Sequence, residues 1–406
     1  RGDHSRVEKY IENDCGKVSK TQIVLFCIYI FLSFFETYLT RFFGNGTKFY
    51  LLFILAVFLY QVRFRIKVNR IWIFYLAWFA YKFMSISWSS MTNSDFNTHL
   101  LSQIGMLLFV IVMVGREQEK TLLYAILQSC LWVSFLFGVL SIFFRDAFLD
   151  EVFAARQVLT LFGQQNDPNN CAAFLLVGVT LALYSATIER KKVLLNTVIV
   201  AVNTYALMLT SSRAGFLTLG ALIIGLVFLP QPGKHLQLKE TAMKLGIIVV
   251  VVAITVFIVQ KFLPQVNMDR LIIWSGYESG SGRDIRWQRS VELFLQKPLF
   301  GWGWSGYNTG VGAIHNTFLT SLCDVGIFGT VLFSMPLVLI GVESFRNKNN
   351  LALLLLMAGI LPSFALDAIN KRFFWDAIVF SAMLSTYQKQ TAERITVWGF
   401  LDDGKA

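Results

Sequence analysis

Hydrophobic runs long enough to cross a bilayer recur along the whole chain, and short polar segments separate them. A membrane-spanning helix needs roughly 17–25 predominantly apolar residues, so this pattern predicts about twelve such helices. They are expected at residues 22–40, 49–62, 71–88, 99–114, 121–144, 171–187, 193–210, 214–229, 243–263, 316–342, 351–366 and 375–388. With twelve crossings, both ends of the chain would lie on the same side of the membrane.

Two stretches between these runs are longer and more polar than the other connections. The first, residues 264–315, contains GSGRDIRWQRSVELFLQKPLFGWGWSGYNTGVGAIH from Gly280 onwards. Apolar side chains in it recur with the spacing of one helical face, which predicts an amphipathic helix; they are Trp287, Val291, Phe294 and Leu295. The second stretch, residues 145–170, begins as an amphipathic segment and ends in QQNDPNN, a typical turn and helix start.

The composition supports a membrane protein. The chain has 406 residues, of which 55% are hydrophobic and 15% charged, with a mean hydropathy of +0.57; this is too apolar for a soluble globule. Its net charge of +11 lies mainly in short connections, so membrane topology accounts for it and no nucleic-acid partner is expected. We predict a single all-α polytopic integral membrane domain over residues 1–406.

The distribution of lysine and arginine predicts the orientation of that domain. If the N-terminus is cytoplasmic, the inner segments hold 22 of these residues and the short outer loops hold seven. Cytoplasmic loops carry the excess of positive charge in membrane proteins. Both termini are therefore expected in the cytoplasm, and residues 264–315 and 145–170 are expected on the outer face.

Arginines provide the first candidate site residues. Arg213 lies in the turn SSRAG between two apolar runs, where it either faces a polar cavity or extends to the lipid headgroups. Arg283, Arg286 and Arg289 repeat every three residues in the predicted amphipathic helix. Guanidinium groups suit phosphate because they are permanently charged and offer a planar fork of donors. The alternative is a solvated basic face that binds anionic headgroups loosely.

His315 and Asn316 stand immediately before an apolar run on the outer side. A histidine there can take a proton from a sugar hydroxyl near neutral pH, and the amide can orient the imidazole or hold a hydroxyl. The alternative is a helix-start histidine held by local hydrogen bonds. His99, also at the outer end of a predicted span, is a weaker competitor.

The Gly/Trp run at residues 301–306 follows a predicted helix rather than a strand, so it is not a dinucleotide loop. Trp302 and Trp304 could stack on sugar rings, or they could form an interfacial aromatic loop. The chain contains no DxD, no HExxH and no His/Cys set at ligand spacing, and its five cysteines include no CxxC. Neither a metal ion nor any other cofactor is expected.

These segments resemble the O-antigen ligase and O-antigen (capsular) polysaccharide polymerase superfamily. SGR at 281–283, Trp287, KPLFGWGWSGY at 297–307 and HNTFLTSLCDVGIFG at 315–329 follow the family pattern GR…W…PLxGxG…HNxFL…GxxG. SSRAG at 211–215 is similar to the family's SRG turn. The resemblance covers about a third of the chain at the level of motifs.

The resemblance implies a metal-independent, inverting glycosyltransferase of GT-C-like architecture in the bacterial cytoplasmic (inner) membrane. Its partners would be an undecaprenyl-pyrophosphate-linked oligosaccharide donor, a glycan acceptor and the bilayer, with chain-length regulator and flippase proteins as further candidates. Arg213 and Arg283 would hold the pyrophosphate and His315 would activate the acceptor. Additional contacts are expected from Arg286, Arg289, Asn316, Gln165, Asn166, Asp167, Trp302 and Trp304.

The family motifs do not separate polymerases from ligases. We favour a polymerase that joins lipid-linked repeat units, because the long outer segment 145–170 resembles those of capsule polymerases. A ligase that transfers the glycan to lipid A-core or another acceptor is the alternative. A flippase or transporter is less favoured, because charge within the spans is sparse and the arginines cluster on one face.

Overall fold

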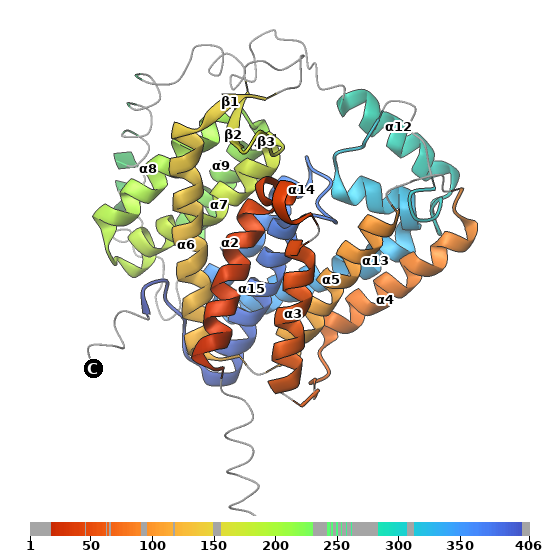
Figure 1. The fold of residues 1–406 in the computed structure, drawn as a ribbon, viewed down its shortest axis with the longest axis horizontal. Coiled ribbons are helices and arrows are strands. Elements are labelled where there is room, and N and C mark those ends of the chain that lie inside the picture. The colour runs from red at the N-terminus through yellow and green to blue at the C-terminus, as the bar shows by residue number, and fades with distance from the viewer. Residues whose placement is uncertain are drawn as a thin grey trace, which may run out of the picture.

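The computed structural model describes residues 18–44, 46–61, 63–64, 66–90, 96–116, 118–148, 156–229, 283–306 and 312–399, with scattered positions between 242 and 261. Most of this chain is helical (Figure 1). The helices are α2 (Lys20–Phe43), α3 (Gly46–Gln61), α4 (Arg70–Met84), α5 (Phe96–Val114), α6 (Lys120–Phe143), α7 (Pro168–Tyr184), α8 (Val193–Leu209), α9 (Arg213–Phe228), α12 (Arg283–Gln296), α13 (Thr317–Arg346), α14 (Asn350–Ser363) and α15 (Arg372–Thr391). Single turns η1 (Ser85–Trp88) and η3 (Ser185–Glu189) extend α4 and α7.

The predicted all-α architecture is confirmed. Eleven of the twelve predicted spans fall on helices, and the twelfth, residues 243–263, lies largely outside the described residues. Among the described helices, four are long and apolar enough to cross a membrane: Lys20–Phe43, Lys120–Phe143, Pro168–Glu189 and Thr317–Arg346. Five shorter apolar helices accompany them. The fold is therefore that of an α-helical membrane protein.

Helix α7 lies at the centre of the bundle. Of its most apolar window, 89% is buried inside the protein, against 39–44% for α2, α6 and α13. It packs against α6, α8, α9 and α14. The outer helices present large exposed aromatic residues, such as Phe53, Phe143 and Phe328. Such surfaces suit lipid, because apolar side chains carry no group that needs a hydrogen bond and a helix satisfies its own backbone groups.

The polar segment 145–170 forms a small antiparallel sheet, which the sequence did not predict. Its strands are β1 (Arg145–Ala147), β2 (Gln157–Leu161) and β3 (Gln164–Gln165), in the order β1–β2–β3. Phe162 and Gly163 join β2 to β3 with φ of 55° and 73°, as a two-residue type I′ hairpin requires. Residues 149–155 of the predicted amphipathic stretch lie outside the described residues.

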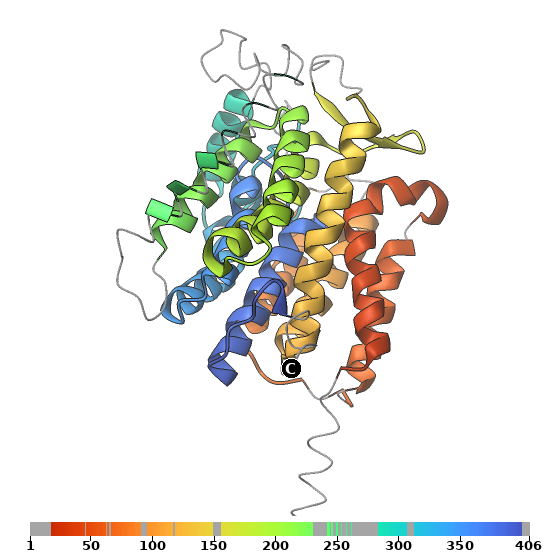
Figure 2. The same ribbon diagram turned by 90° about the vertical axis from the view of Figure 1, so that its left-hand side faces the viewer.

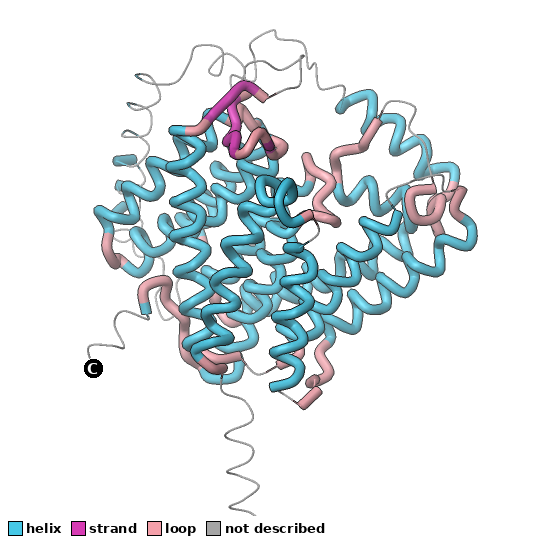
Figure 3. Tube along the Cα trace, viewed as in Figure 1, coloured by secondary structure: helices cyan, strands magenta, loops and turns pink. Residues whose placement is uncertain are grey.

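The sheet and α12 lie at the same end of the bundle, whereas α2 begins and α15 ends at the opposite end (Figures 1 and 2). Loops that connect helices at the first end include those before α7, α9, α13 and α15 (Figure 3). The two polar segments that the sequence singled out therefore lie at the same end of the bundle, and the candidate site residues lie in or beside them.

Candidate functional site

The start of α7 is built around Asp167, as the QQNDPNN pattern predicted. Its carboxylate caps the helix by accepting from the backbone N–H groups of Asn169 (2.8 Å) and Asn170 (3.2 Å), and Pro168 occupies the first turn. Caps of this kind satisfy donors that the first turn leaves unpaired. The helix start thus fixes a carboxylate at the polar end of the bundle.

A buried hydrogen-bond network joins this helix start to the SSRAG turn. The side-chain oxygen of Asn169 accepts from the Arg156 guanidinium (2.9 Å) and from the Ser212 hydroxyl (2.8 Å), and Arg156 also donates to the carbonyl of Thr210 (3.1 Å). Ser212 caps α9, so Arg213 becomes its first residue. The network fixes the position of Arg213, which is half-buried, relative to α7.

Helix α12 begins at Arg283 and packs on α13, as expected for an amphipathic helix. The Trp287 indole N–H donates to the carbonyl of Ile314 (3.1 Å), and Leu293, Ile314 and Cys323 form a small core between the two helices. Of the four apolar residues predicted to share a face, Trp287 and Phe294 pack against this core, whereas Val291 and Leu295 are 42% and 66% exposed. Leu293, and not these two residues, faces the bundle.

His315 stands where the chain turns from this contact into α13. Its φ is +54°, a left-handed conformation that non-glycine residues rarely adopt. Asn316 caps α13 by accepting from the backbone N–H groups of Phe318 and Leu319, each at 3.1 Å. The amide oxygen predicted to contact substrate is thus engaged in the helix start. The cap and the Ile314 contact fix the backbone on both sides of the histidine.

Electrostatic interactions link His315 to four other predicted site residues, three of them directly and Arg213 through Arg283. The pKa of His315 is lowered by burial first and then by Arg283 and Arg286, while Asp167 opposes the shift. The pKa of Arg283 is likewise lowered by burial, and by Arg286 and Arg213, with Asp167 again opposing it. Three guanidinium groups, a carboxylate and an imidazole from three separate stretches of the chain therefore form one cluster, which we call the arginine–histidine cluster.

Arg289 is separated from Arg286 although both were predicted to contact substrate. Arg286 is half-buried and lies close to Gly312, just before His315. Arg289 is exposed and pairs with Glu292 one turn along α12, at 2.8 Å. The three-residue spacing rotates successive side chains around the helix, so only part of the predicted set faces the cluster.

The Gly/Trp run is a packed structural loop. Trp304 is 2% exposed and its indole lies under the Lys82 ammonium, whereas the Trp302 indole donates to the carbonyl of Leu293 (2.8 Å) and stacks against Lys297. The buried Trp304 ring is therefore not available to stack on a sugar ring, which is one of the two roles predicted for it. The reason is that the loop is held between α4 and a break in α13 at Gly326, which buries this ring.

Of the remaining predicted contacts, the side-chain amide of Gln165 donates to the carbonyl of Ala147 and to the hydroxyl of Thr160, which stabilises the small sheet. Asn166 is buried and accepts from the side-chain amide of Asn170. Two residues that the sequence analysis did not single out also belong to this region. Arg156 organises the network described above, and the charge of Lys371 acts on His315. Lys371 could have been noticed as a basic residue in an outer loop, but no motif marks it.

Within the described residues, no group of three or more His, Cys, Asp or Glu side chains is placed to hold a metal ion. Residues 197–334 match the family model described as O-antigen ligase, and no curated protein matches the chain. The match begins in α8, includes Arg213, His315 and the Gly/Trp loop, and ends within α13. It confirms the resemblance of the chain to the O-antigen ligase and polymerase superfamily.

Proposed function

From this O-antigen ligase match and the arginine–histidine cluster together, we propose that the chain is a polysaccharide polymerase of that superfamily. It joins undecaprenyl-pyrophosphate-linked repeat units on the outer face of the cytoplasmic membrane. The observation that carries the proposal is that the charges of Arg283 and Arg286 act on His315, and that of Arg213 acts on Arg283, at one end of an apolar bundle. Concentrated positive charge beside a neutral base suits the departure of a pyrophosphate.

The reaction is a single displacement at the anomeric carbon of the donor. The acceptor hydroxyl oxygen forms the new bond to that carbon while the bond to the pyrophosphate oxygen breaks, which inverts the configuration. His315 takes the hydroxyl proton, because its lowered pKa keeps the imidazole unprotonated at neutral pH. Arg213 and Arg283 hold the pyrophosphate and stabilise its developing charge, and fixed cations in a partly buried site are well suited to this.

Asp167 has a supporting part in this scheme. Its charge acts on both Arg283 and His315, so it offsets part of the repulsion among the guanidinium groups before the donor binds. It is fixed by its role as the cap of α7. We assign it to organisation of the cluster and not to proton transfer.

The test is to incubate the purified protein and its lipid-linked repeat unit and to resolve the products by size on a gel. Wild type is expected to give a ladder of longer lipid-linked glycans. His315→Ala and Arg283→Ala should each reduce the rate by about 10²-fold or more, the scale for a general base or an oxyanion-stabilising group. Arg346→Ala, an exposed arginine at the end of α13, is the matched control and should retain full activity.

The alternative outcomes separate the competing functions. Transfer only to a different added acceptor would make the protein a ligase with the same cluster. Full activity in both His315→Ala and Arg283→Ala would show that the arginine–histidine cluster is not the active site. A wild-type protein that moves lipid-linked glycan across vesicles without forming a glycosidic bond would instead be a transporter.

A further inference from the structure

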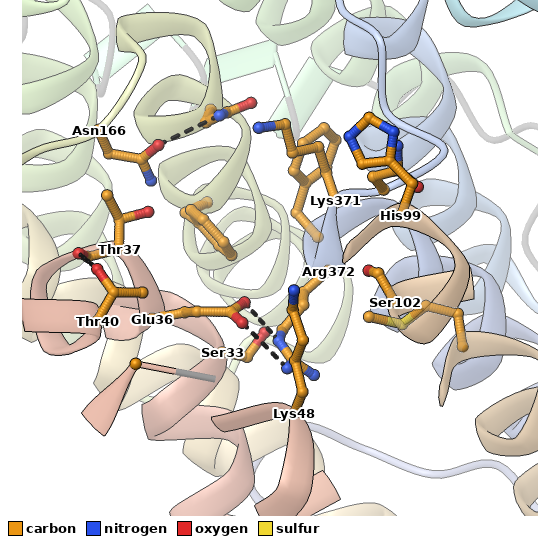
Figure 4. Close-up of a pocket in the computed structure, with 16 residues that line it drawn as sticks. Ser33, Glu36, Thr37, Thr40, Lys48, His99, Ser102, Asn166, Lys371 and Arg372 are labelled. Carbon is orange, nitrogen blue, oxygen red and sulfur yellow. Dashed lines mark hydrogen bonds and ion pairs between the residues drawn. The ribbon is translucent and has the colours of Figure 1, made fainter. Parts of the chain in front are cut away.

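A cavity of about 310 Å³, lined by many polar side chains, lies between α2, α3, α5, α7 and the start of α15 (Figure 4). Its volume is at the lower end of the range for small-molecule sites. Neither His315 nor the cluster arginines line it. It adjoins the cluster at two points: Asn166 precedes Asp167, and Lys371 carries a charge that acts on His315.

The floor of the cavity is fixed by an ion pair. Arg372 donates to both carboxylate oxygens of Glu36, at 2.6 and 3.2 Å, and the Thr47 hydroxyl donates to the same carboxylate at 2.7 Å. This fork–fork pair joins α15 to α2 and neutralises both charges. It leaves the cavity with an excess of positive charge, because Lys48 and Lys371 also line it.

The two lysines differ from the paired arginine. Within the described part of the chain, neither Lys48 nor Lys371 lies within ion-pair distance of a carboxylate, although the charge of Glu36 acts on Lys48. Lys48 is half-buried and Lys371 is exposed at the edge of the cavity. In Figure 4 both side chains extend into the space between Glu36, Asn166 and His99. An anionic group in the cavity would meet two ammonium groups.

Two buried polar atoms in the lining lack a hydrogen-bond partner within the part of the chain that the structure describes. They are Nη1 of Arg372 and Oδ1 of Asn170, whose residues are only 5% and 4% exposed. Buried polar groups are normally satisfied by protein, water or ligand. The first belongs to the guanidinium that is paired with Glu36 and lies over the Tyr29 ring. The second is an acceptor that needs an O–H or N–H group.

We propose that this cavity binds an acidic sugar residue of the acceptor glycan. A sugar acid supplies both features at once: a carboxylate for Lys48 and Lys371, and hydroxyl groups for Asn170 and Asn166. A pyrophosphate would satisfy the cations but would offer no hydroxyl donor to Asn170. The inference rests on the proposed function, because it places the acceptor beside the histidine that takes its proton.

Binding, measured by titration calorimetry with the full chain in detergent, tests this inference apart from transfer. The probes are an oligosaccharide with one hexuronic acid residue, its carboxyl-reduced counterpart and inorganic pyrophosphate. The acidic probe should bind at least ~10-fold more tightly than the reduced one, because one charge-assisted hydrogen bond of about 1.4 kcal/mol gives that ratio. Lys48→Gln and Lys371→Gln should each remove most of this preference and leave binding of the reduced probe unchanged.

Lys389→Gln is the matched control, since Lys389 is exposed and pairs with Glu343 at the opposite end of the bundle; it should bind as wild type does. Equal binding of the acidic and reduced probes would overturn the inference. So would pyrophosphate binding that depends on both lysines, which would assign the cavity to the phosphates of the carrier. His315→Ala should lose glycosyl transfer but keep the preference for the acidic probe. Transfer activity therefore tests the proposed function, and the binding preference tests this inference independently.

Discussion

His315 lies among guanidinium groups, where an imidazolium is disfavoured and the neutral base is favoured. Its pKa is held below the ordinary value of about 6.5 by burial and by Arg283 and Arg286. The histidine is therefore unprotonated at neutral pH without a carboxylate to activate it. When a pyrophosphate binds, its negative charge offsets the positive charge of the arginines. The imidazole then binds a proton more tightly, at the step in which it takes the proton of the acceptor hydroxyl.

This environment predicts the pH dependence of glycosyl transfer. The value of kcat/KM should be constant above about pH 6.5 and should fall at lower pH, with an acidic limb below the ordinary histidine pKa. In Arg286→Gln one cation that disfavours the imidazolium is removed, so the pKa of His315 rises and the limb should move to higher pH. Rates measured from pH 4.5 to 8 would contradict this if the limb stays in place or moves to lower pH.

At the residue level, the sequence predicted the members of the cluster that motifs mark. Arg213, Arg283 and His315 each belong to a segment with recognisable spacing. Arg156 and Lys371 could not be found in this way, because their places depend on contacts between segments that are far apart in the chain. Arg156 meets Asn169 and Thr210, and only the fold brings these together.

Among the elements, helices were predictable and their irregular connections were not. A helix in a membrane shows itself locally through a long apolar run, whereas β1–β3 form through pairing between short strands with little signal of their own. The Gly/Trp loop shows the same limit. The backbone N–H groups of Gly301, Trp302 and Gly303 donate to the carbonyls of Lys297, Cys323 and Asp324, respectively. Cys323 and Asp324 lie just before the break in α13 at Gly326, so the burial of Trp304 depends on that break.

The anchor of this loop is a buried ion pair, which gives a prediction about stability. Lys82 on α4 and Asp324 on α13 are 3.4 Å apart with side chains 3% and 4% exposed, and Asp324 also accepts from the backbone of Ser305 (2.9 Å). Removing one partner of such a pair leaves an uncompensated buried charge and costs about 3–5 kcal/mol.

Asp324→Asn should therefore lower the thermal unfolding temperature in detergent strongly, although it keeps the acceptor for Ser305. Adding Lys82→Met to Asp324→Asn removes the orphaned ammonium and should restore most of the loss. The measurement is the unfolding temperature of the two single variants and the double variant. A double variant no more stable than the worse single variant would show that the pair does not act as a charge-balanced unit.

In the molecule as a whole, the cluster, the sheet and α12 lie at one end, and α2 begins and α15 ends at the other (Figure 1). This arrangement agrees with the alternation of the predicted spans. From the excess of lysine and arginine in the segments predicted to be inner, we expect the end where α2 begins and α15 ends to face the cytoplasm. The cluster would then face outward, where lipid-linked glycans are joined.

Cysteine labelling in intact cells tests that orientation. Gln288→Cys on the exposed face of α12 and Lys389→Cys near the end of α15 are both accessible positions, and the described native cysteines are buried or half-buried. In a Cys15→Ser background, a membrane-impermeant maleimide should label Gln288→Cys in intact cells and Lys389→Cys only after permeabilisation. The reverse pattern would place the arginine–histidine cluster in the cytoplasm, where an outward-facing polymerase cannot work, whereas labelling of both positions in intact cells would contradict the alternation of the spans.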